Sequence, residues 1–597
     1  MPIQIQTRVS RAELVDVALG RAPADLVIEN GRLVDVYSGE IRSASVAIKG
    51  ERIAYVGDDA SHTKVEHTEV IDAAGYHLSP GLMDAHVHIE ASMVTPTQFA
   101  RALLPRGNTA LLWETLWTAN VLGMAGIERL LEECRLTPLK FFATAASGVP
   151  CTAPELATPA QVFSDADITR LLARDDVVGL GELVLFNQVL RNQADIRRQI
   201  DMALQQGKTV DGSVPGFADR RLNAYAAAGA QSDHEAITLD EAVERIRLGL
   251  RLVIREGSSM RNLAELIRVA TERGLSTRRC CFCVDDKDIR EIEREGLVDQ
   301  LVRQAIRSGV DPVQAVQMAT LNPAEYFGLE RDLGGIAPGR IADILLVGDL
   351  NDFAVETVIA SGRVVARAGQ LLVDWPQPPS AEGMLQTIRL PRAILPDDFT
   401  CRSDRSGQTR LRALRVFGEQ IVSVEQPAKL AVEGGEILPD VGRDLLRMAV
   451  IERHGKTAAP NIGLGFVAGF GLRRGAIASS VSPDIHQIVT VGVDKGDMAQ
   501  AVARLAELQG GIVAVADGRV LAELALPVGG LMSGLPYEEV IAQLERLSAA
   551  AAGLGCSLPS PFMTLAFAAC PTLIELKLSD KGLIDVGAGR LLPLELD

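Results

Sequence analysis

Short apolar segments separated by turn-forming residues fill the first 80 residues of the chain. Four of them have the length and composition of strands, at 26–28, 32–36, 45–48 and 52–56. The turns expected between strands are the dipeptides Asn30-Gly31, Ser38-Gly39 and Lys49-Gly50, which suit tight hairpins. Similar segments return at 342–347 and 356–365. The pattern therefore predicts one small β-sandwich domain assembled from residues 1–80 and 331–385.

Between these two flanks, apolar strand-like runs alternate with helical patterns. The runs end near His88, Glu114, Ser147, Glu182, Ser213, His234, Glu256 and Asp285. Helical patterns between them include 126–134, 195–206, 239–248 and 260–273. Eight strands separated by helices is the count of a (β/α)8 barrel. The alternation therefore predicts an α/β fold with a TIM-like barrel over residues 81–330.

A Pro-rich stretch, Trp375-Pro376-Gln377-Pro378-Pro379, ends the returning flank and indicates a domain boundary. Beyond it the pattern becomes mixed, with strands expected near 411–416, 448–452 and 512–516. We predict a separate C-terminal α+β domain over residues 386–597. Glycines are dense from Gly463 to Gly475, but the segment has no P-loop lysine and no strand–GxGxxG–helix context, which argues against nucleotide binding.

Charge and composition narrow the function classes. The 597 residues carry a formal net charge of -17, which argues against a nucleic acid or an anionic membrane as partner. We find no apolar run of membrane-spanning length and no signal-peptide core near the N-terminus. The eight cysteines do not resemble a disulfide framework, and Cys281 and Cys283 lie in an apolar run, where buried thiols are favoured over a metal site. We therefore expect a cytoplasmic protein.

Ligand-type side chains gather where the barrel strands are expected to end. His86 and His88 lie two residues apart on a strand, so they point to the same side. Neutral imidazole is a common ligand for divalent transition metals. The carboxyl ends of the strands share one face of a (β/α)8 barrel, and Glu182, His234 and Asp285 fall on that face too. These five residues predict a metal site.

Each of these residues also has a purely structural interpretation. Two close histidines can pack at a strand end, and His234 can belong to a turn or a helix cap. Glu182 is a lone carboxylate in an apolar run, which either a metal or a salt bridge would compensate. Asp285 precedes Asp286, and one of the two can cap the next helix. Five ligand-type residues on one face favour the metal.

Several motifs together resemble the bacterial adenine deaminases of the amidohydrolase superfamily. In the barrel region they are Pro80-Gly81-Leu82-Met83-Asp84-Ala85-His86-Val87-His88, Leu222-Asn223-Ala224-Tyr225, Ser232-Asp233-His234-Glu235, Ile254-Arg255-Glu256-Gly257-Ser258, Phe282-Cys283-Val284-Asp285-Asp286 and Ala319-Thr320-Leu321-Asn322-Pro323. Further downstream, three motifs resemble the family's own C-terminal domain, namely Glu452-Arg453-His454-Gly455, Gly463-Leu464-Gly465-Phe466 and Pro561-Phe562-Met563-Thr564-Leu565. The resemblance thus extends over nearly the whole chain.

This resemblance implies a purine-catabolic hydrolase with a binuclear site, usually supplied with manganese, or with iron or zinc, that converts adenine to hypoxanthine and ammonia. It places His86, His88 and Asp285 on one metal, Glu182 between the metals and His234 on the second. Asp285 would accept a proton from metal-activated water and help pass one to the leaving amine, with Glu182 as the second catalytic residue. A small purine-like substrate and a homo-oligomer are expected.

The chain departs from the family pattern at two important places. Ser213 stands where the family has a fifth-strand histidine, and because a hydroxyl is a poor ligand for such metals, one ion per chain is an alternative to two. The run from Trp113 to Trp117 replaces the family's Asp-Pro-His-Glu beside the substrate. The residues expected to bind substrate are Glu114, Trp117, Glu256 and Ser213. For Glu256 the alternative to substrate binding is an ion pair. For His486 a structural role and a functional role are equally expected.

These departures leave two further functions open. One is a related amidohydrolase that acts on a different aminated heterocycle or on a cyclic amide. The other is a paralogue that binds metal or ligand without turnover. The preserved set of five ligand-type residues favours the deaminase.

Overall fold

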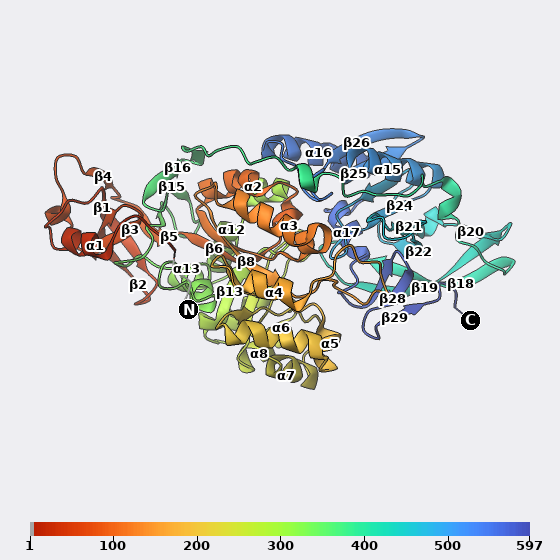
Figure 1. Cartoon of the computed structure of the whole chain (residues 1–597), viewed down its shortest axis with the longest axis horizontal. Helices are drawn as coiled ribbons and strands as arrows, with labels where there is room; N and C mark the ends of the chain where they lie inside the picture. Colours follow the sequence, from red (N-terminus) through yellow and green to blue (C-terminus); the bar gives the residue numbers. More distant parts are fainter. Residues whose placement is uncertain (1–4, 597) are drawn as a thin grey trace.

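The two segments that flank the barrel form a single sheet. In the computed structural model, which describes residues 5–596, the strand order is β17-β16-β15-β14-β5-β1-β2-β3, and β4 pairs beside β1. The strands are β1 (Leu26–Asp35), β2 (Glu40–Lys49), β3 (Arg52–Gly57), β4 (Glu69–Asp72), β5 (His77–Pro80), β14 (Ile344–Val347), β15 (Val355–Ala360), β16 (Arg363–Arg367) and β17 (Gln370–Leu371). The antiparallel pair β5–β14 joins the two segments, and the helix α1 (Arg11–Ala18) packs on β2 and β3. This sheet lies at one end of the molecule (Figure 1).

The hairpin turn expected at Asn30-Gly31 is wrong. Residues 26–35 form one continuous strand whose register with β2 shifts between Ile28 and Gly31. Asn30 has a φ of 58°, a left-handed conformation that asparagine tolerates better than most residues. The preference of Asn-Gly for positive φ is therefore met by a bulge within one strand, and not by a turn between two strands.

Eight parallel strands build the predicted (β/α)8 barrel. They are β6 (Leu82–Val87), β7 (Asn108–Trp113), β8 (Lys140–Ala146), β9 (Val177–Gly181), β10 (Thr209–Val210), β11 (Ser232–Asp233), β12 (Arg251–Arg255) and β13 (Cys280–Cys283). One set runs β10-β9-β8-β7-β6 and the other β11-β12-β13. The ring closes at both joins, where Gln231 N donates to Val210 O at 3.0 Å and Asp285 N donates to His86 O at 3.0 Å. The fold class is therefore confirmed.

Helices follow the strands around the outside of the barrel (Figure 1). They include α2 (Pro96–Leu103), α3 (Leu116–Cys134), α4 (Asp165–Leu172), α6 (Ala194–Gln205), α7 (Arg220–Ala227), α8 (Leu239–Arg247), α11 (Ile289–Glu295) and α12 (Val298–Arg307). The helix expected over 260–273 is instead two short helices, α9 (Leu263–Leu266) and α10 (Arg268–Thr271). All eight cysteines are buried and unpaired, as expected from their apolar surroundings.

The C-terminal part centres on a second nine-stranded sheet, in the order β20-β19-β18-β22-β21-β24-β23-β25-β26. Its strands are β18 (Gly407–Val416), β19 (Ser423–Glu433), β20 (Glu436–Ile437), β21 (Leu446–Ile451), β22 (Ile462–Ala468), β23 (Ala476–Ser479), β24 (Ile488–Gly492), β25 (Gly511–Ala516) and β26 (Arg519–Ala525). A small sheet of β27 (Leu576–Ser579), β28 (Gly582–Asp585) and β29 (Arg590–Leu592) and the helices α15 (Lys495–Leu508), α16 (Tyr537–Gly553) and α17 (Pro561–Ala568) complete it.

This part packs directly on the barrel. Helix α16 contacts α2 and α11 of the barrel, and α17 lies between the C-terminal sheet and the barrel (Figure 1). Hydrogen bonds cross the contact, since Asp580 Oδ1 accepts from Thr158 N at 3.0 Å and Gln487 Nε2 donates to Thr158 O at 2.9 Å. The C-terminal part therefore faces the barrel end where the strands terminate.

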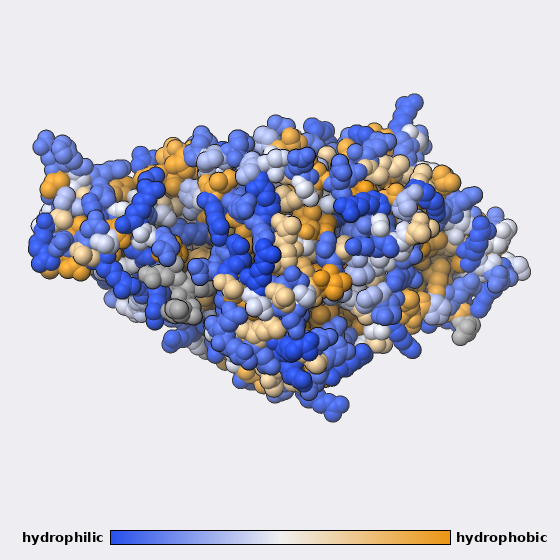
Figure 2. All heavy atoms as spheres, in the orientation of Figure 1, coloured by the Kyte–Doolittle hydropathy of each residue, from blue (hydrophilic) through white to orange (hydrophobic). Residues whose placement is uncertain are grey.

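One face of the molecule is mainly polar. The face in Figure 2 is mostly hydrophilic, and its apolar side chains lie in small separate groups. Across residues 5–596 we find no helix with the length and apolar character needed to cross a membrane.

Candidate active site

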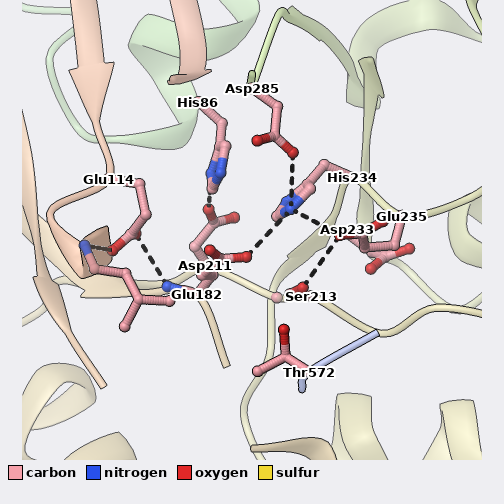
Figure 3. A network of polar contacts seen from close by, with 12 residues as sticks. His86, Glu114, Glu182, Asp211, Ser213, Asp233, His234, Glu235, Asp285 and Thr572 are labelled. Carbon is pink, nitrogen blue, oxygen red and sulfur yellow. Dashed lines mark hydrogen bonds and ion pairs between the residues drawn. The ribbon is translucent and has the colours of Figure 1, made fainter. Parts of the chain in front are cut away.

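Five ligand-type side chains meet at the carboxyl ends of the barrel strands. Glu182, directly after β9, has one oxygen 3.3 Å from His88 Nε2 and the other 3.3 Å from His234 Nε2. Asp285, two residues after β13, has Oδ1 at 3.6 Å from His88 Nε2 and Oδ2 at 3.6 Å from His234 Nε2. The His86 ring lies beside the His234 ring, with centroids 4.0 Å apart. Figure 3 shows His86, Glu182, His234 and Asp285 pointing toward one common space.

The backbone of Asp285 is held in place by β6. His88 N donates to Asp285 O at 2.8 Å, and Asp285 N donates to His86 O at 3.0 Å. Asp285 also has a φ of 59°, in the left-handed region that non-glycine residues seldom adopt. Such a conformation persists only where the surroundings over-determine it, and it is concentrated at functional sites. The two ladder bonds to β6 therefore fix the carboxylate of Asp285 between His88 and His234.

Asp211 orients His86, and the sequence patterns did not single it out. It follows β10 and its Oδ2 lies 2.8 Å from His86 Nδ1, with both side chains buried. The Nε2 atom of His86 is buried and has no hydrogen-bond partner. A carboxylate on one ring nitrogen fixes the tautomer and leaves the other nitrogen available as a ligand, which is common for metal-binding histidines.

The donor set fits a divalent metal. Ligand atoms lie within 4.8 Å of one another in His86-His234-Asp285, in His86-His88-Glu182 and in Glu182-His234-Glu235. Both ring nitrogens of His234 and Oε2 of Glu235 are buried and make no hydrogen bond. Buried polar atoms are rarely left unpaired, and mixed imidazole and carboxylate donors suit first-row divalent cations. The cluster is therefore able to hold a metal.

The charged side chains of the cluster shift one another's pKa values. Burial alone lowers the pKa of His88, but the Glu182 and Asp285 carboxylates outweigh it and raise the pKa to about 9. Burial alone raises the pKa of Glu182, and the His234 and His88 rings reverse this and hold the pKa well below its usual range. The carboxylates thus remain ionised inside the protein only because cationic groups surround them, a role that bound metal ions also fill.

Arg255 forms an ion pair at the edge of the cluster. Its guanidinium lies 2.5 Å from Asp285 Oδ2, also pairs with Asp286, and is 3.6 Å from Glu235 Oε1. Asp286 therefore does not cap the following helix α11, where Asp288 accepts from Glu291 N instead. Arg255 thus pairs with the same oxygen of Asp285 that faces His234.

A cavity opens above this cluster. It is lined by His88, Trp117, Glu182, Val184, Ser213, Glu235, Arg255, Asp285, Asp484, Phe567, Cys570, Thr572 and Leu573. Two of the residues expected to bind substrate, Ser213 and Trp117, lie on its wall. Trp117 stacks on the His88 ring with centroids 4.6 Å apart and planes 16° apart. An apolar, aromatic wall beside metal-binding side chains suits a flat heterocyclic ligand.

Glu114 lies behind the cluster and not on the cavity wall. Its carboxylate accepts from Glu182 N at 3.0 Å, from Leu116 N at 3.1 Å and from the hydroxyl of Thr144. Both of its oxygens are therefore occupied by protein donors, and its geometry is that of a support for the Glu182 backbone.

Glu256 also lies away from the cavity. Its Oε2 accepts from Leu263 N at 3.0 Å, and Arg261 is 3.9 Å from its other oxygen. Successive side chains at a strand end point to opposite sides, so Arg255 faces the cluster and Glu256 faces outward. The ion-pair interpretation of Glu256 agrees with this geometry.

The C-terminal part contributes the opposite wall. Five of the lining residues, namely Asp484, Phe567, Cys570, Thr572 and Leu573, come from it. Figure 3 shows Thr572 pointing toward Ser213 from across the cavity. Asp484 lies two residues before His486, in a run that the sequence patterns had marked only for its histidine.

His486 itself does not line the cavity. It is buried against Trp117, with ring centroids 5.0 Å apart, and its Nδ1 accepts from Ser482 N at 3.1 Å. Burial holds the pKa of His486 well below its usual range, so the ring is neutral. Its position supports Trp117 from behind.

Comparisons with known proteins agree with this architecture. The model of the amidohydrolase family matches residues 77–365, and the model of the adenine deaminase C-terminal domain matches residues 420–590. The adenine deaminase of Dehalococcoides mccartyi is 41% identical over 99% of this chain and 100% of its own length. The chain belongs to the adenine deaminase family.

A second adenine deaminase shows the same extent of similarity. The adenine deaminase of Moorella thermoacetica is 42% identical over 96% of each chain. Among solved structures, a β-aspartyl dipeptidase from Fervidobacterium islandicum has 18% identity and a TM-score of 0.45, covering 58% of this chain and 98% of that chain. As a member of the adenine deaminase family, the chain is a hydrolase of the amidohydrolase superfamily.

Proposed function

We propose that this protein hydrolyses adenine to hypoxanthine and ammonia. The observation that carries the proposal is the meeting of five side chains, namely His86, His88, Glu182, His234 and Asp285. Three of them, His88, Glu182 and Asp285, line a cavity whose wall includes an indole ring. Relatives that cover nearly the whole chain are adenine deaminases, which supports adenine as the substrate.

The five residues of the cluster would bind the metals in different ways. His86, His88 and Asp285 would hold one metal, Glu182 would be shared, and His234 would hold a second. A bound divalent metal lowers the pKa of its water and so supplies the nucleophile near neutral pH. The reaction adds the water oxygen to C6 of adenine and breaks the bond from C6 to the exocyclic nitrogen, which leaves as ammonia.

Asp285 is placed to move the protons. One of its oxygens faces His88 and the other faces His234 and Arg255, so the carboxylate reaches both sides of the cluster. Arg255 and the histidines lower the pKa of Asp285 against the effect of burial, which keeps it ready to accept a proton. Asp285 takes a proton from the attacking water and returns one to the leaving nitrogen.

We further propose manganese as the resident cation, with iron or zinc as alternatives. Three carboxylates, Glu182, Asp285 and Glu235, surround the three histidines. Oxygen-rich donor sets favour manganese more than all-nitrogen or sulfur sets do, while the imidazoles also suit iron and zinc.

Ammonia release from a panel of substrates tests the proposed function. The purified protein, loaded separately with each of the three metals, is assayed for ammonia release from adenine, guanine and cytosine. Ring opening is measured for dihydrouracil, a cyclic amide whose hydrolysis releases no ammonia. Ammonia from adenine in stoichiometric yield with hypoxanthine is expected. Turnover of another compound only would favour a related hydrolase, and full metal occupancy with no turnover on any compound would favour a non-catalytic protein.

A further inference from the structure

A carboxylate from the C-terminal part lies in the cavity with one oxygen unused. Asp484 is 4% exposed, and Thr572 Oγ1 donates to its Oδ2 at 2.7 Å. The thiol of Cys570 lies 3.8 Å from the same oxygen. Within residues 5–596 the side-chain hydrogen bonds of Asp484 go to Oδ2, and we find none to Oδ1. A nearly buried carboxylate with a free oxygen in a cavity is positioned to accept a hydrogen bond from a ligand.

This acceptor shares the cavity with the metal-binding cluster but belongs to a different wall. Glu182 and Asp285 lie at the ends of barrel strands, whereas Asp484 and Thr572 come from the C-terminal part. Thr572 holds Oδ2, so the side chain has a fixed orientation.

Adenine offers only two kinds of N–H group. The exocyclic amine is bonded to the carbon that reacts, so it lies at the metal end of the cavity. The other N–H is on the five-membered ring, which lies away from the reacting carbon. An acceptor on the wall that the C-terminal part supplies therefore matches the ring N–H. The other ring nitrogens are acceptors that a carboxylate does not bind.

We propose that Asp484 accepts a hydrogen bond from the N–H of the five-membered ring of adenine and so selects the free base over forms substituted at N9. The inference rests on the proposed function, because it takes adenine as the ligand and the cluster as the reacting end. A substituent at N9 removes the donor and leaves a buried carboxylate oxygen without a partner. A site built around such a hydrogen bond rejects the analogue that lacks it.

The test compares two unreactive ligands that differ only in this donor. Purine carries the ring N–H and 9-methylpurine does not, and neither has an amine to lose. Their inhibition constants against adenine are measured for the wild type, for Asp484→Asn, which keeps the shape of the side chain, and for Asp484→Ala. The control is Asp580→Asn, a buried carboxylate of the C-terminal part that bonds Thr158 N and does not line the cavity.

We expect the wild type to bind purine more tightly than 9-methylpurine. Both Asp484 variants should raise the inhibition constant of purine and the KM of adenine by about 10- to 100-fold, the usual cost of losing a hydrogen bond to a charged group. The constant of 9-methylpurine should change less than about threefold, since it makes no such bond. Asp580→Asn should leave the preference for purine unchanged, and metal content should be equal in all four proteins.

An unchanged preference for purine in Asp484→Asn and Asp484→Ala, with metal content intact, would overturn the inference. So would a wild type that binds the two ligands equally or binds neither. A failure of the proposed function gives a different result, because the wild type would then release no ammonia from adenine. In that case the binding of the same two ligands would be compared by calorimetry.

Discussion

The Nδ1 atom of His86 lies 2.8 Å from Oδ2 of Asp211, and its Nε2 atom is buried without a partner. Asp211 thereby orients the ring that begins the metal-binding cluster. Asp211 is itself anchored, because its backbone N–H bonds Leu180 O at 3.0 Å and its backbone oxygen accepts from Leu183 N at 3.0 Å. The β9–β10 pair therefore positions a ligand of β6 from across the barrel.

Removing this carboxylate should weaken metal binding. We expect Asp211→Asn to lower metal affinity by about 10- to 100-fold, as is usual for the partner of a ligating histidine. Metal titration of the metal-free protein measures this. Asp240→Asn, which changes an exposed carboxylate of α8, is the control. Equal affinities in Asp211→Asn and the wild type would show that Asp211 does not orient the ligand.

We expect Ser213 to limit the binding of a second metal ion. Its hydroxyl lies 3.5 Å from Glu235 Oε1, on the cavity wall beside the cluster. A histidine at this position adds an imidazole donor, so Ser213→His should raise metal content toward about two ions per chain and increase the rate of ammonia release. Ser213→Ala, which adds no donor, should change neither quantity. No change in either metal content or rate in Ser213→His would contradict the limit.

Glu114 is a support for Glu182 and not a substrate ligand in this structure. Glu114→Gln replaces one acceptor by a donor that faces an N–H or hydroxyl donor, so we expect a loss of about 1–3 kcal/mol in the free energy of unfolding. The KM of adenine should remain unchanged, because the side chain does not reach the cavity wall. A large rise in KM without a change in thermal stability would restore the substrate-binding role.

Lys577 should make stability depend on alkaline pH. It is buried, its Nζ donates to Ile421 O at 2.8 Å and to Phe567 O at 2.9 Å, and burial lowers its pKa from 10.5 to about 8. Between these pH values the unfolded chain holds a proton that the folded chain has released. The contribution of Lys577 to the free energy of unfolding therefore rises with pH across this window, by about 3 kcal/mol in total.

Comparison with Lys577→Met isolates this contribution, since all other groups titrate equally in both proteins. The thermal midpoint of the wild type should rise relative to that of the variant between pH 8 and 10.5. Below pH 8 the lysine is protonated in both states, so the difference should be constant there. A difference that does not vary between pH 7 and 10.5 would contradict the lowered pKa.

Hydrophobic patterning predicted the barrel well because its strands are short, buried and followed by helices. Once the strand ends were located, residues such as His88 and Glu182 were expected at one face, because parallel strands bring their carboxyl ends together. Glu256 was expected there too, but alternation at the end of β12 turned Arg255 inward instead. A one-residue shift along a strand reverses the direction of a side chain, and patterning does not locate strand ends to one residue.

Residues that reach the site from other segments had no local signal. Asp211 lies in a short polar run after a two-residue strand, and its role depends on the distance to His86 across the barrel. Asp484 and Thr572 come from the C-terminal part, whose placement against the barrel depends on long-range packing. Motifs from the family's C-terminal domain indicated that the domain was present but did not indicate that it closes the cavity.

The most direct test of the metal-dependent deamination is a metal titration of activity. Protein stripped with a chelator is given increasing equivalents of Mn²⁺, and ammonia release from adenine is measured at each step together with bound metal. We predict no turnover in the stripped protein, and turnover that rises with occupancy and stops rising when the cluster is full. His88→Asn should abolish both binding and turnover. Full activity in the stripped protein, or saturated metal without ammonia from adenine, would contradict the account.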